Sequence, residues 1–107
     1  MNKLILFVAA LSLAFGANAG KTWTDKLEDW SIYIDNGVVY IHSGSMPAGC
    51  SHDRAQIDTS STIKSETNQR DIYSFALMSY ASGKDLYIVT DESESPCFVY
   101  GVKNKKY

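Results

Sequence analysis

The stretch WSIYIDNGVVYIH, residues 30–42, carries the strongest fold signal in this chain of 107 residues. Apolar and polar side chains alternate over residues 30–35, and this period of two predicts a half-buried β-strand. Asn36-Gly37 follows and favours a two-residue type I′ turn, because both turn residues need a positive φ. Val38–His42 predicts the returning strand, so the stretch as a whole predicts an antiparallel hairpin.

A two-residue turn also determines which side chains share a face of the hairpin. The face expected in the core carries Trp30, Ile32, Ile34, Val39 and Ile41. The opposite face, which we name the hairpin platform, carries Ser31, Tyr33, Tyr40 and His42. Two interpretations of the platform stay open. It is either a cross-strand aromatic pair that stabilises the sheet, or a flat polar and aromatic surface on which a sugar stacks.

Three further strands are predicted, over residues 54–58 (RAQID), 85–91 (DLYIVTD) and 97–102 (CFVYGV). Residues 20–28 are polar with one Trp and predict a lead-in strand or a loose arm, and a polar loop is expected over 59–68. The order is β-β-β-α-β-β, which predicts a small α+β fold that is mostly β, with one helix.

The helix is expected over residues 69–82, where apolar side chains follow a helical period. Asn68 with Asp71 predicts an N-cap, and Gly83 predicts the C-terminal stop. One stripe, suited to packing on the sheet, holds Ile72, Phe75, Ala76 and Ser79. A second stripe holds Tyr73, Leu77, Tyr80 and Ala81. An exposed apolar stripe on a small domain marks an interface, so we expect a homo-oligomer that buries Tyr73, Leu77 and Tyr80.

The first residues have the pattern of a signal peptide for export. Lys3 precedes the apolar run of residues 4–15, and Ala17-Asn18-Ala19 is a small-residue cleavage pattern. The run is too short to span a bilayer. We therefore expect residues 1–19 to be removed, and residues 20–107 to form a single small β-rich domain, periplasmic or secreted. The net charge of −2 argues against nucleic-acid binding.

The only two cysteines, Cys50 and Cys97, are expected to form a disulfide, because an even count in an exported protein indicates one. Cys50 lies close to His52, so a catalytic thiolate or a metal site are the alternatives. Zinc would need more ligands than the two histidines supply. We expect no metal site and no cofactor.

The hairpin, the motif PAGC at residues 47–50, the stretch IYSFALMSYASGKDLYIV at 72–89 and the second Cys resemble a group of small exported proteobacterial proteins. The element order resembles the OB-fold B subunits of AB5 toxins, an architectural similarity without a shared motif. Those subunits are exported, contain a disulfide and form rings of five that bind cell-surface glycans. The resemblance implies a five-stranded OB-like barrel or curled sheet.

An enzyme is the least supported class, because the sequence has no nucleophile motif, paired carboxylates or metal triad. We expect an exported, non-catalytic binding module that binds a glycan on the hairpin platform. The alternative is a periplasmic inhibitor or immunity-type protein that binds a protein partner through the loop SGSMPAGCSHDR, residues 43–54. A structural accessory of the cell envelope is a third class.

Overall fold

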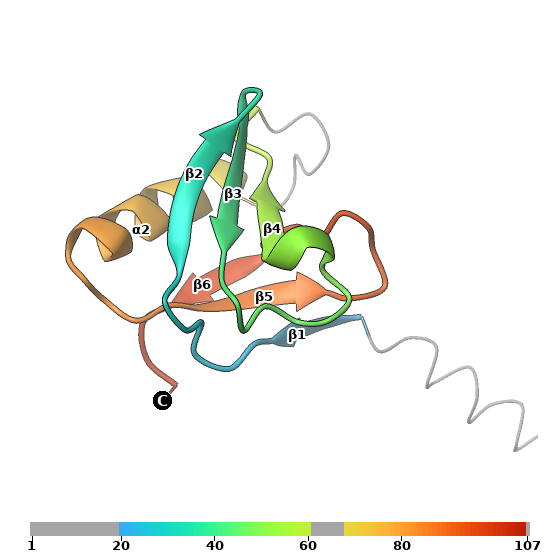
Figure 1. The fold of residues 1–107 in the computed structure, drawn as a ribbon. Helices are drawn as coiled ribbons and strands as arrows, with labels where there is room; N and C mark the ends of the chain where they lie inside the picture. Colours follow the sequence, from blue (N-terminus) through green and yellow to red (C-terminus); the bar gives the residue numbers. More distant parts are fainter. Residues whose placement is uncertain (1–19, 61–67, 107) are drawn as a thin grey trace, which may run out of the picture.

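A computed structural model describes residues 20–60 and 68–106 (Figure 1). The predicted signal peptide and most of the predicted loop at 59–68 lie outside the described residues. The described chain forms six β-strands in two three-stranded sheets, with one α-helix and one short 3-10 helix. In chain order the elements are β1 (Lys21–Trp23), β2 (Ser31–Asp35), β3 (Val38–His42), η1 (Ser51–Asp53), β4 (Arg54–Ile57), α2 (Gln69–Ala81), β5 (Tyr87–Asp91) and β6 (Gly101–Lys103).

The hairpin prediction is confirmed down to its register. Tyr33 lies opposite Tyr40 across β2 and β3, and Ile34 lies opposite Val39. Asn36 and Gly37 both have a positive φ, 54° and 78°, as the two-residue turn requires. The predicted faces therefore follow directly from the turn.

The burial of the inner hairpin face differs from the prediction at one residue. Val39 and Ile41 are buried, and Trp30 and Ile32 pack half-buried against the core. Ile34 is 62% exposed, so its assignment to the core is wrong. β2 is an edge strand of its sheet, and the hairpin tip projects beyond α2, so none of the helices and strands in the described residues covers this position (Figure 1).

The second sheet has the order β1-β5-β6 and is antiparallel throughout. The lead-in residues form β1, which raises the strand number from the five expected to six. The strands of this sheet run across those of the β2-β3-β4 sheet in Figure 1. A parallel bridge between Gln56 and Phe98 joins the two sheets, but they are not closed into a barrel. The predicted five-stranded barrel is therefore not established.

The helix α2 packs its predicted stripe inward. Ile72, Ala76 and Ser79 are buried, and Phe75 is half-buried against the core. Asn68 occupies the N-cap position, although its side chain makes no capping hydrogen bond. At the other end Gly83 has a φ of 65°, and its N–H donates to the carbonyl of Tyr80, which confirms the predicted stop.

The Gln69 side chain, which the sequence analysis did not single out, connects three parts of the core. This side chain is fully buried. Its Oε1 accepts a hydrogen bond from the Asp58 N–H at 2.8 Å, and its Nε2 donates to the Val99 carbonyl at 2.7 Å. The start of α2 is thus tied both to the end of β4 and to the segment before β6.

Cys50 and Cys97 form a disulfide, as predicted, and both residues are buried. The bond links the loop before β4 to the segment that bridges the two sheets. An oxidised sulfur is not a thiolate nucleophile, so the interpretation of Cys50 as a catalytic residue is wrong for this state of the protein.

Candidate functional site

The four platform residues, Ser31, Tyr33, Tyr40 and His42, lie on one face of the β2-β3 hairpin, because the register places their side chains there. Tyr33 is exposed and the other three are half-buried. The rings of Tyr33 and Tyr40 lie 5.6 Å apart between centroids, with their planes tilted by 32°. Figure 1 shows both strands, with β3 flanked by β2 and β4.

Arg54 on β4 completes this face, and the sequence analysis did not place it there. Its guanidinium lies 3.8 Å from the centroid of the Tyr40 ring. Its Nη1 donates to the Tyr33 hydroxyl at 3.1 Å and lies 3.8 Å from the Asp35 carboxylate. The hydrogen bond to Tyr33 is the main cause that raises the pKa of Arg54. Because the guanidinium covers one side of the Tyr40 ring, the platform is not a bare aromatic surface.

A hollow of about 700 Å³ opens at the Ser31 and His42 end of the platform. We name it the Trp30 hollow. Its lining consists of Glu28, Asp29, Trp30, Ser31, His42, Gly44, Ser45 and Tyr80. Trp30 and Tyr80 meet edge to face, with ring centroids 5.3 Å apart. The Trp30 Nε1 donates to the Lys84 carbonyl at 3.2 Å, which fixes the orientation of the indole.

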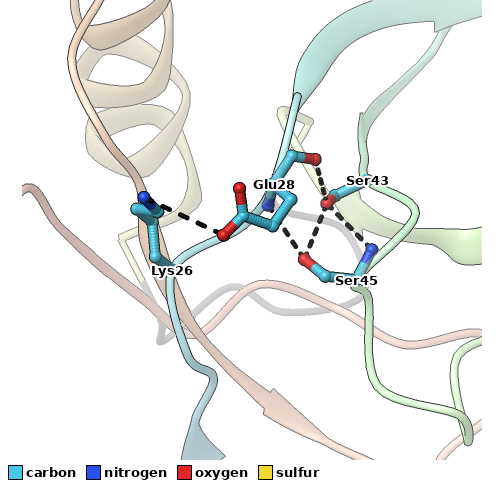
Figure 2. Close-up of polar contacts among 4 residues, drawn as sticks. All are labelled: Lys26, Glu28, Ser43 and Ser45. Carbon is cyan, nitrogen blue, oxygen red and sulfur yellow. Dashed lines mark hydrogen bonds and ion pairs between the residues drawn. The ribbon is translucent and has the colours of Figure 1, made fainter.

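Two serines hold the rim of the Trp30 hollow in place (Figure 2). The buried Ser43 hydroxyl donates to the Glu28 carbonyl at 2.7 Å, and the Glu28 N–H donates to Ser45 Oγ at 2.9 Å. The Glu28 carboxylate points away from these bonds, 3.8 Å from Lys26 Nζ. The segment before β2 and the loop after β3 are thus tied together, so the hollow is formed before any ligand arrives.

A second hollow, of about 340 Å³, lies on the β4 side of β3. Its lining consists of Tyr40, Ser51, His52, Arg54, Gln56, Ser95, Pro96 and Cys97. The cluster around Cys50 therefore supplies an imidazole and a guanidinium to a surface hollow, beside the disulfide. The predicted platform residues are thus divided, with Ser31 and His42 at one hollow and Tyr40 at the other.

The predicted interface residues on α2 lie in different environments. Tyr73 is half-buried, and Leu77 is 41% exposed. Tyr80 is exposed but contacts Trp30, so it belongs to the hollow as well as to the second stripe.

Nothing in residues 20–60 and 68–106 brings three or more His, Cys, Asp or Glu side chains together in a way that could hold a metal ion. Within the same ranges, no helix is long and apolar enough to cross a membrane. Comparison with protein-family models, curated proteins and solved structures finds no match. The function is therefore argued from the sites themselves.

Proposed function

We propose that the protein is an exported, non-catalytic binding module whose ligand is a glycan bound in the Trp30 hollow and along the adjoining platform. One observation carries this proposal. Ser31 and His42 line the same hollow as the Trp30–Tyr80 pair and the acidic residues Glu28 and Asp29.

This combination matches the chemistry of a sugar. The C–H faces of a pyranose pack on aromatic rings, while carboxylate, imidazole and hydroxyl groups bind its hydroxyls. Binding sites in general combine an apolar surface with a few placed polar groups. The hydrogen bonds that fix Trp30 and the rim reduce the entropy lost on binding.

The same proposal includes export of the protein and an architecture similar to that of the AB5 B subunits. A disulfide between buried cysteines fits an oxidising compartment. The main chain of Gln56 makes two hydrogen bonds that join the two sheets along one side. Its carbonyl accepts from the Val99 N–H at 3.0 Å, and its N–H donates to the Cys97 carbonyl at 2.7 Å. Such a junction suits a partly open, OB-like barrel.

The test is a glycan-array screen of the oxidised protein, residues 20–107, followed by titration of the best glycan. His42→Ala should weaken binding about two- to twelvefold, because a hydrogen bond of roughly 0.5–1.5 kcal/mol is lost. His52→Ala is the matched control, since His52 lies outside the Trp30 hollow. If the His42→Ala variant binds the glycan with unchanged affinity, the glycan binds outside the Trp30 hollow.

We further propose that the second stripe of α2 forms a homo-oligomer that buries Tyr73, Leu77 and Tyr80. Leu77 is exposed, and Ile34 projects from the edge strand β2, which α2 contacts. Both side chains are apolar surface that a second subunit would cover.

Light scattering of the oxidised protein should show an oligomer that Leu77→Asp dissociates, because the interface would then bury an unpaired charge. Met78→Asp adds the same charge to the same helix outside the stripe and should leave the oligomer intact. A monomeric wild-type protein at high micromolar concentration would contradict the proposal.

The inhibitor function is supported by one observation on the loop of residues 43–54. The disulfide at Cys50 and the buried Met46 hold this loop, while Ala48, Gly49 and Ser51 stay exposed. A rigid, exposed loop is suited to enter the cleft of a partner protein. A pull-down from periplasmic extract tests it. A protein that binds the wild type and does not bind the Ala48→Arg variant would favour this function over glycan binding.

A further inference from the structure

The outer face of the β1-β5-β6 sheet is a separate surface with an unusual composition. Ile88 and Thr90 are buried, so the alternating residue Tyr87 on β5 points outward. Trp23 pairs with Val89, and Lys103 pairs with Tyr87, which places both on this outer side. We name the surface formed by Lys21, Trp23, Tyr87 and Lys103 the lysine–tryptophan face.

Both ammonium groups of this face lie over aromatic rings. Lys103 Nζ lies 4.2 Å from the centroid of the Trp23 ring and 5.8 Å from that of Tyr87. Lys21 Nζ lies 4.6 Å from the centroid of Tyr100, beside the face. These distances are within the range of a cation–π contact, about 6 Å. The positive charges are thus held directly against the aromatic surface.

The Trp23 indole lies along the sheet. Trp23 Cη2 reaches to within 3.5 Å of where a Cβ at position 101 would stand, so the ring extends from β1 over β5 toward Gly101 on β6. Even so, Trp23 is 44% exposed. The Lys103 ammonium covers part of the indole, and the rest of the ring is accessible.

The face carries the two lysines and one carboxylate, because Asp91 lies opposite Lys21 in the pairing of β1 with β5. Lys105 and Lys106 follow β6 and are exposed, and no acidic residue occurs after Glu94. The nearby carboxylates are engaged, since Asp91 accepts from the N–H and hydroxyl of Ser93, and Glu94 accepts from the Tyr100 hydroxyl. Lys21, Lys103, Lys105 and Lys106 outnumber these two carboxylates, and this excess of positive charge points to an anionic ligand.

We propose that the lysine–tryptophan face binds an acidic saccharide. A sugar ring lies against the part of Trp23 that the Lys103 ammonium does not cover, and its carboxylate, sulfate or phosphate groups pair with Lys21 and Lys103. A membrane surface fits less well, because the indole lies along the sheet instead of projecting for insertion. This site shares no residue with the Trp30 hollow and does not depend on the glycan proposed there.

The test is calorimetric titration of the oxidised protein with a short heparin oligosaccharide at low salt. The wild type should bind, and Trp23→Ala should weaken binding about tenfold or more. Lys103→Gln should weaken it about two- to fivefold and leave the sheet unchanged, as checked by circular dichroism. Arg70→Gln removes the same charge from α2 and is the matched control, which should bind like the wild type.

Three results would overturn the proposal. The first is no binding of the oligosaccharide. The second is equal weakening by Arg70→Gln and Lys103→Gln, which would show a nonspecific effect of charge. The third is tighter, Trp23-dependent binding to phosphatidylglycerol vesicles or to oligothymidylate, which would assign the face to a membrane or to single-stranded nucleic acid.

Discussion

Removal of the disulfide, in the double variant Cys50→Ala and Cys97→Ala, is expected to lower the free energy of unfolding by about 4 kcal/mol. The bond spans 47 residues of sequence and so constrains a large part of the unfolded chain. It also fixes the loop before β4 against the segment that bridges the two sheets. Stabilities of small domains are only about 5–15 kcal/mol, so the variant should be close to unfolding.

Urea denaturation of the variant and of the oxidised protein provides the measurement. The reduced wild-type protein is the control, because it lacks the bond but keeps both sulfurs. The variant and the reduced protein should lose similar amounts of stability. A loss below about 1 kcal/mol in both would show that the disulfide does not hold the sheets together.

Ile41→Ala is expected to cost about 2–5 kcal/mol of unfolding free energy, the usual range for a buried isoleucine. Ile41 lies in the core at 0% exposure, so the truncation leaves a cavity there. Ile34→Ala is a closely matched control, because it makes the same change on the same face of the paired strand at 62% exposure. Its cost should stay below about 1 kcal/mol. Equal costs in a monomeric sample would contradict the described burial of the hairpin.

The parts of the fold that local chemistry determines could be predicted from the sequence. Asn36-Gly37 allows only a tight hairpin, and a two-residue turn leaves one register for β2 and β3. Gly83 ends α2 because a residue with positive φ is needed there. The disulfide followed from two cysteines in a chain expected to be exported.

The rest depends on contacts between distant segments. Ile34 has the right alternation for the core, but burial needs a covering element, and within residues 20–60 and 68–106 none covers Ile34. Arg54 joins the platform only because β4 pairs with β3, and no short turn between them fixes that register. β1 is a short polar segment, Lys21–Trp23, which is a strand because β5 pairs with it.

The two candidate sites also differ in how much of each could be predicted from local sequence. Ser31 and His42 were predicted to share a face because both lie on the hairpin. Trp30 was expected only in the core, yet it also lines the hollow, because Tyr80 at the end of α2 packs beside it. The lysine–tryptophan face needs β1 and β6 on either side of β5, a pairing that no local pattern reveals.

The central claim is that a glycan binds beside Trp30, and nuclear magnetic resonance tests it most directly. The chain has two tryptophans, Trp30 at the hollow and Trp23 on the opposite sheet, so each indole N–H signal reports on one site. Titration with the best glycan from the array should shift the Trp30 indole and the amides of Ser31 and His42. A bound glycan that leaves these three signals in place, or an array without any bound glycan, would contradict the account.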